Sequence, residues 1–166
     1  MRNLIAIPVV LLAVILQSAV ISRVYLLSGS ADLPLVMLAA WALQEDVDSA
    51  WHWAAALGCM VGFVSAIPWY VPVLTYLVVV GLAQMLQRRV WQAPLLAMFS
   101  VTFVGTILLS ILSYLVLRIA GVLMPLEDVL GLLTLPSVLL NMLLAIPAYA
   151  IMRDLSRWVY PTPEVE

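Results

Sequence analysis

Six apolar runs follow one another along this chain, separated by short polar stretches. The first, Leu4–Ile21, has 18 residues, the length at which an apolar run becomes a candidate membrane-spanning helix. The other five are Leu33–Leu43, Trp51–Ile67, Val71–Leu86, Pro94–Leu117 and Leu130–Met152. Apolar residues make up 66% of the chain and charged residues 10%, against about half and about a quarter in soluble domains. The sequence therefore predicts an all-α membrane protein with about six transmembrane helices.

The second run is the short one. The 11 residues of Leu33–Leu43 cannot cross a bilayer alone at about 1.5 Å per residue, so this run either recruits its flanks or enters the membrane partway. The first run is longer than a signal-peptide core and lacks a small-residue cleavage site, so we expect an uncleaved first span. We expect residues 1–160 to form a single integral membrane domain and residues 161–166 to form a short polar tail.

The arginines predict the orientation. With six crossings and a cytoplasmic N-terminus, Arg23 and Arg118 lie outside, whereas the other five basic residues lie on the cytoplasmic side, where positive charge concentrates. Those five are Arg2 and the four topology anchors Arg88, Arg89, Arg153 and Arg157. We therefore expect both termini to be cytoplasmic. Five crossings would break this distribution, which is a reason to prefer six.

Small and polar residues recur at helical spacing inside several runs. In lipid, such a face packs helices of one chain together, lines a polar cavity for a ligand, or meets another protein. We favour packing within the chain and expect Asn141 to be buried, because an amide is costly in lipid. Pro147 should kink the last run. The helix-packing candidates are Thr102, Thr106, Ser137, Asn141 and Pro147, and the third run adds the GxxxG pair Gly58 and Gly62.

No motif in the sequence indicates catalysis. Cys59 and His52 are the only cysteine and the only histidine, so we expect no metal and no cofactor. Asp32 and Asp154 stand at the ends of apolar runs, and no carboxylate lies clearly within one, which argues against ion-coupled transport. The few scattered arginines do not form a nucleic-acid surface. We therefore expect a protein that is not an enzyme.

Several stretches carry a family resemblance. They are "LQSAV" in the first run, "ADLPLVMLAAWAL" at the second, "GCMVGF" in the third, "LTYLVVVGLAQMLQRR" in the fourth and "PSVLLNMLLAIPAYAIMRDLSR" in the last. Together they resemble the MreD family, small membrane proteins of the bacterial rod-shape system. The family often has an aspartate after the "GF" stretch, whereas this chain continues "VSAIPWY", so no role of that aspartate is carried over.

The resemblance implies a six-helix fold similar to the substrate-binding subunits of energy-coupling-factor transporters. It implies a scaffold of the elongation complex in the bacterial cytoplasmic (inner) membrane. The implied partners are MreC, RodA with its class B penicillin-binding protein, and MreB indirectly, and the outcome is control of sidewall peptidoglycan synthesis and cell shape. A homodimer is left open.

Four residues are the candidates for partner binding: Gln17, Asp32, Gly58 and Gly62. We expect bulky substitutions at the two glycines to release the partner while the protein stays folded. The alternative function is a solute-binding membrane subunit of a transporter, which the same fold suggests.

Overall fold

The computed structural model describes residues 2–19, 23, 25–44, 47, 50–88 and 93–160 of the chain, and these are mostly helical. Each of the six predicted apolar runs coincides with a helix. In chain order the elements are α1 (Arg2–Ala19), β1 (Tyr25–Leu26), β2 (Gly29–Ser30), α2 (Leu33–Ala42), α3 (Ala50–Val64), α4 (Tyr70–Gln87), α5 (Pro94–Ile119), α6 (Leu126–Asp128), the π-helix η2 (Val129–Thr134) and α7 (Leu135–Val159).

Three helical stretches are long and apolar enough to cross a membrane. They are Tyr70–Gln87, Pro94–Ile119 and the continuous stretch Leu126–Val159. The apolar helices Pro8–Ala19, Leu33–Ala42 and Ala50–Val64 are shorter. The predicted helical character is thus confirmed apart from one short hairpin, and the three long apolar helices are compatible with a membrane protein. The number of six crossings and the likeness to a transporter subunit fold stay predictions.

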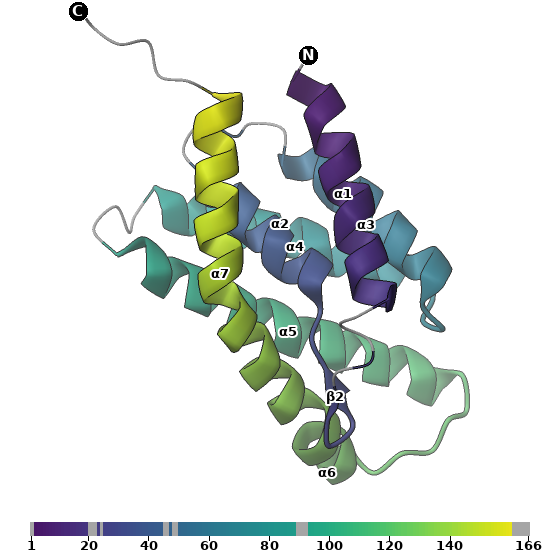
Figure 1. The fold of residues 1–166 in the computed structure, drawn as a ribbon. Coiled ribbons are helices and arrows are strands. Elements are labelled where there is room, and N and C mark those ends of the chain that lie inside the picture. The colour runs from purple at the N-terminus through teal and green to yellow at the C-terminus, as the bar shows by residue number, and fades with distance from the viewer. Residues whose placement is uncertain are drawn as a thin grey trace, which may run out of the picture.

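Helix α2 lies at the centre of the bundle, and helices α1, α3, α4, α5 and α7 all pack against it (Figure 1). Its sequence, LPLVMLAAWA, is apolar on every side, and a helix of that kind is stable only where it is surrounded. Leu35, Val36 and Ala39 are each 0% exposed. At about 1.5 Å per residue, this helix covers only about half the thickness of a bilayer core.

A small hairpin leads into α2. Strands β1 and β2 pair antiparallel, and Leu27 takes a positive φ of 56° in the turn between them. The backbone N–H of Ser28 donates to the carbonyl oxygen of Leu132 in η2, at 3.1 Å. The hairpin is thereby attached to the segment that precedes α7. The sequence indicated only a short polar stretch between two apolar runs here.

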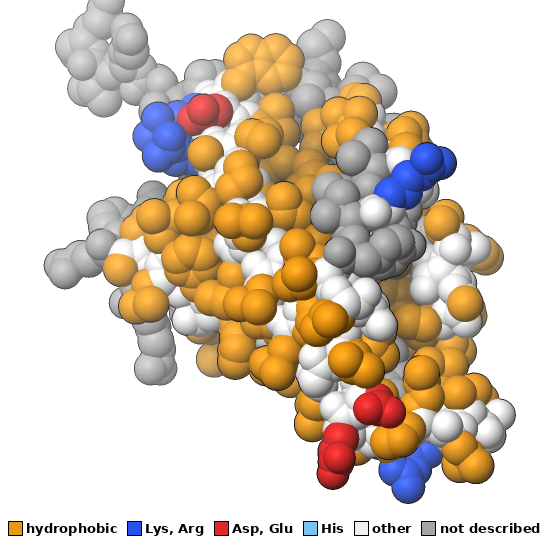
Figure 2. Space-filling model, turned by 60° about the horizontal axis from the view of Figure 1, so that its bottom comes forward, with side chains coloured by type: hydrophobic (Ala, Val, Ile, Leu, Met, Phe, Trp, Pro, Cys, Tyr) orange, Lys and Arg blue, Asp and Glu red, His pale blue; other side chains and the backbone are white. Residues whose placement is uncertain are grey.

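The bundle has two ends of different make-up. Helix α1 begins and α7 ends at one end, whereas the hairpin and α6 lie at the other (Figure 1). Apolar side chains cover most of the face in Figure 2, and charged side chains lie towards its edges. Phe63, Ile119 and Leu123 are 84%, 87% and 90% exposed. Such an apolar exterior fits lipid better than water.

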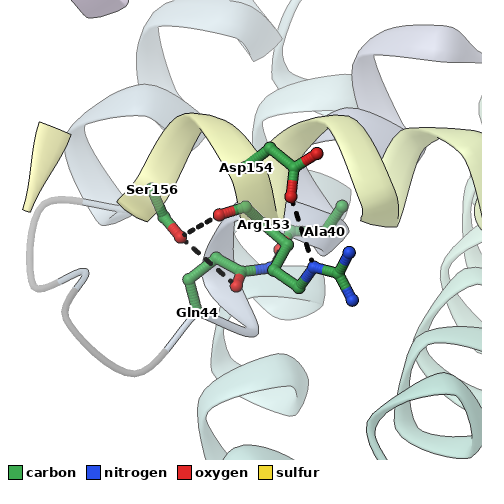
Figure 3. Close-up of polar contacts among 5 residues, drawn as sticks. All are labelled: Ala40, Gln44, Arg153, Asp154 and Ser156. Carbon is green, nitrogen blue, oxygen red and sulfur yellow. Dashed lines mark hydrogen bonds and ion pairs between the residues drawn. The ribbon is translucent and has the colours of Figure 1, made fainter. Parts of the chain in front are cut away.

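A polar contact joins the C-terminal end of α2 to α7, near the end of the bundle where α7 finishes (Figure 3). The Gln44 side chain follows α2 and donates to the carbonyl oxygen of Ala40 at 2.8 Å. The Ser156 hydroxyl lies 3.5 Å from Oε1 of Gln44 and 2.8 Å from the carbonyl oxygen of Arg153. Gln44 and Ser156 are both buried. The single hydroxyl proton of Ser156 goes to the nearer carbonyl oxygen of Arg153, so its approach to Gln44 is the weaker of the two contacts.

Candidate functional site

Asp32 occupies the position where the hairpin ends and α2 begins. Its carboxylate caps the helix by accepting the backbone N–H of Leu35 at 3.0 Å, as an N-cap aspartate does. The hydroxyl of Tyr76 on α4 lies 2.9 Å and 3.0 Å from the two carboxylate oxygens. The start of α2 is therefore tied to the interior face of α4.

Asn141 connects this point to the two longest helical stretches. Its Oδ1 accepts the backbone N–H of Asp32 at 2.7 Å, and its Nδ2 donates to Oγ1 of Thr106 on α5 at 2.9 Å. The Thr106 hydroxyl in turn donates to the carbonyl oxygen of Thr102 at 2.7 Å. Asn141 is 1% exposed, so its amide is used inside the protein. One continuous polar network thus links α2, α4, α5 and α7.

Gln17 of α1 holds the backbone on both sides of Asp32. Its Nε2 donates to the carbonyl oxygen of Ala31 at 2.8 Å, and its Oε1 accepts the backbone N–H of Leu33 at 2.8 Å. Non-helical backbone inside a membrane protein needs such partners, because lipid offers none. Gln17 therefore supports the segment leading into α2 from within the chain.

The network places Asp32 deep in the bundle. Thr106 lies near the middle of Pro94–Ile119, and Asn141 lies near the middle of Leu126–Val159. Asp32 stands at the end of an apolar run, as expected, but this end lies beside the middle of two long helical stretches. The physical reason is that α2 begins inside the bundle, after an extended segment whose backbone groups are bonded by Gln17 and Asn141.

A cavity of about 660 Å³ lies against this network, a size typical of small-molecule sites. Its polar lining includes Gln17, Asp32, Thr106, Ser110, Ser137 and Asn141, and its apolar lining includes Val14, Val61, Leu109, Leu117, Met124 and Leu133. Most of these residues come from the C-terminal parts of α1 and α3, the second half of α5, and the region from η2 to the first half of α7, whereas Asp32 precedes α2 and Met124 lies in the connection after α5. The cavity therefore lies in the half of the bundle opposite to the start of α1.

The two glycines of the third run pack inside the chain. A Cβ atom on Gly58 would lie 2.6 Å from Cα of Val73, and one on Gly62 would lie 2.4 Å from Cα of Trp69. Both neighbours belong to the backbone at or next to the start of α4. The expectation that bulky residues here would leave the protein folded is therefore corrected, because the backbone of α4 occupies the space that a side chain would need.

The remaining helix-packing candidates have different surroundings. Ser137 is half-buried and lines the cavity. Thr102 is 0% exposed, and its hydroxyl oxygen has no hydrogen-bond partner in the described part of the chain. Pro147 was expected to pack between helices, but it lies on the exposed side of α7. The expected kink is present: α7 changes direction along its length (Figure 1), as a proline inside a helix causes.

The described topology anchors lie on the surface. Arg88 is exposed at the end of α4, and Arg157 is exposed in the last turn of α7. Arg153 forms an ion pair with the adjacent Asp154 at 3.4 Å (Figure 3), and both side chains are exposed. Arg89 lies outside the described residues.

Tyr76 is the functional-site residue that sequence reasoning missed. It is 0% exposed and is the largest fully buried side chain that the structure describes. A signal existed: tyrosine prefers the membrane interface, yet Tyr76 stands within the apolar run Val71–Leu86. A phenol in such a place needs a buried acceptor, and Asp32 supplies it.

Within the described ranges, no group of three or more His, Cys, Asp or Glu side chains is placed to hold a metal ion. Compared with known proteins, the chain matches no family model, no curated protein and no solved structure.

Proposed function

We propose that this protein is a non-enzymatic membrane scaffold of a bacterial elongation complex, as its resemblance to the MreD family implies. Its role would be to hold the single spanning helix of an MreC-like partner, and through it RodA, the class B penicillin-binding protein and, indirectly, MreB. The protein would lie in the cytoplasmic membrane with both termini inside the cell.

The observation that carries the proposal is the distribution of polar groups. The amides and the carboxylate of the central network bond within the chain, whereas the outer surface of the helices is apolar. Along α1, the side chains Leu11, Leu12, Ile15 and Leu16 are all exposed. A protein with this surface meets its partners through helix packing in lipid, which is what binding one spanning helix requires.

Depletion of the protein in its rod-shaped host tests this function. We expect round, swollen cells, because sidewall synthesis would lose its scaffold. We also expect the MreC-like protein to co-purify with the tagged chain in mild detergent. Depleted cells that keep their shape, together with a purified chain that carries no such partner, would refute the scaffold function.

A second candidate is a solute-binding membrane subunit of a transporter, and the cavity beside Asp32 is the observation that favours it. The position of Asp32 beside the middle of two long apolar helical stretches also weakens one argument against a transport role, since an ionisable residue inside the membrane usually marks a functional site. In that case depleted cells would keep their shape and lose uptake of a small solute.

A further inference from the structure

The carboxylate of Asp32 lacks a positively charged partner in the part of the chain that the structure describes, where the only ion pair joins Arg153 and Asp154. The N-terminus of α2 offsets about half an elementary charge. The hydroxyl of Tyr76 and the backbone N–H of Leu35 are both neutral donors. A substantial part of the negative charge therefore remains uncompensated, and a charge in this setting favours a cation nearby.

The cavity is the space from which a cation could reach Asp32. Asp32 is the only charged residue among the described residues that line it. The two amides beside it already use their oxygens, Gln17 for the N–H of Leu33 and Asn141 for the N–H of Asp32. Asp32 thus supplies the only charged acceptor among the described lining residues.

The walls beyond this point are largely apolar. Val14 on α1, Val61 on α3, and Leu109 and Leu117 on α5 line the cavity. An apolar body would gain from contact with these side chains, at about 25 cal/mol per Å² of surface removed from water. The site therefore combines one negative group with an apolar chamber, which is the complement of an amphipathic cation.

We propose that the cavity binds a compact apolar molecule with a single protonated amine, which donates hydrogen bonds to the Asp32 carboxylate. The proposal goes beyond the scaffold function and does not rest on it. A phospholipid with an amine headgroup fits less well, because its phosphate would also need a partner and none of the described lining residues is an arginine or lysine.

The test uses the full-length chain in phosphatidylcholine nanodiscs and isothermal titration calorimetry, with the heats from empty nanodiscs subtracted. The probes are aminoadamantane, adamantanol and adamantane carboxylate, which share one apolar body and differ in charge. We expect saturable binding of the amine with one site per chain. Adamantanol should bind about tenfold or more weakly, since a hydrogen bond to a charged group is worth about 1.5–3 kcal/mol.

Asp32→Asn is the decisive variant, because asparagine is an equally good N-cap but carries no charge. We expect its affinity for the amine to fall about 10- to 100-fold, with adamantanol binding unchanged. Asp154→Asn is the matched control, since it removes an exposed carboxylate outside the cavity. It should bind the amine like the unmodified chain.

Two further variants keep the test decisive if Asp32→Asn does not fold. Tyr76→Phe removes the hydroxyl that competes with the amine for the carboxylate oxygens of Asp32, so the affinity for the amine should be retained or raised. Ser110→Phe places an aromatic ring in the cavity wall, which narrows the space for all three probes and should weaken the binding of each. Absence of saturable binding, equal affinity for amine and alcohol, or unchanged amine binding in Asp32→Asn would overturn the proposal. Competition by phosphatidylethanolamine in the nanodisc would also overturn the assignment to a free amine.

Discussion

Glycine controls how closely two of these helices approach. At Gly58 the backbone of α4 comes so near to α3 that a single methyl group would lie 2.6 Å from Cα of Val73. Backbone atoms cannot move aside by rotating about a side-chain bond, so the clash would displace a whole helix. The small residue is therefore needed for packing within the chain, whatever else the surface of α3 contacts.

The residue-scale prediction compares Gly58→Ala with Gly131→Ala. Gly58→Ala should lower the free energy of unfolding by about 1–3 kcal/mol, the usual effect of inserting atoms into a well-packed site. Gly131 has no atom within 4 Å of the position of an added Cβ, so its substitution should leave stability unchanged or slightly raised. Thermal unfolding in detergent, followed by tryptophan fluorescence, measures both. Equal midpoints for the two variants would contradict the packing of α3 against α4.

At the scale of elements, α2 is a buried helix with an extended approach. A continuous helix would satisfy its own backbone, but Ala31, Asp32 and Leu33 precede or open the helix and take their partners from α1 and α7. The broken geometry places a helix N-terminus and a carboxylate in the middle of the bundle. It also leaves space beside them, which is the cavity.

The element-scale prediction concerns Gln17→Leu. Leucine has a similar size but leaves the carbonyl of Ala31 and the N–H of Leu33 without their side-chain partner, and each unsatisfied group costs about 1–3 kcal/mol. We expect a clear loss of thermal stability and faster amide hydrogen exchange at Leu33. Gln87→Leu is the control, because it makes the same chemical change at a half-buried position near the end of α4. Equal unfolding midpoints for the two variants would show that Gln17 does not stabilise the extended segment before α2.

For the whole molecule, the arrangement of the ends bears on topology. Helix α1 begins at the end of the bundle where α7 finishes, as an even number of crossings requires (Figure 1). The exposed cations Arg88, Arg153 and Arg157 follow α4 or lie in the last turns of α7. Positive charge of this kind tends to stay on the cytoplasmic side.

The prediction at this scale is that both termini are cytoplasmic. Reporter fusions before Met1 and after Glu166 should both give the cytoplasmic signal, and a fusion in the connection after α5 should give the external one. Opposite signals from the two terminal fusions would mean an odd number of crossings. The segment that contains α2 would then be the one that fails to cross.

Apolar run length determined where the helices lie, because it is a local property that needs no knowledge of the fold. The unfavourable free energy of an unpaired amide in lipid likewise predicted that Asn141 lies inside the protein. A GxxxG pair indicated close approach, but only the structure identified α4 as the neighbour.

The depth of Asp32 was decided by tertiary structure alone. In the sequence it precedes an apolar run, which reads as a position at the membrane surface. In the fold, Gln17 and Asn141 satisfy the backbone on either side of it and Tyr76 bonds its carboxylate, so the run can begin in the middle of the bundle. Those partners lie up to 109 positions away along the chain. The cavity is likewise a tertiary feature, since its lining residues come from segments far apart in the chain.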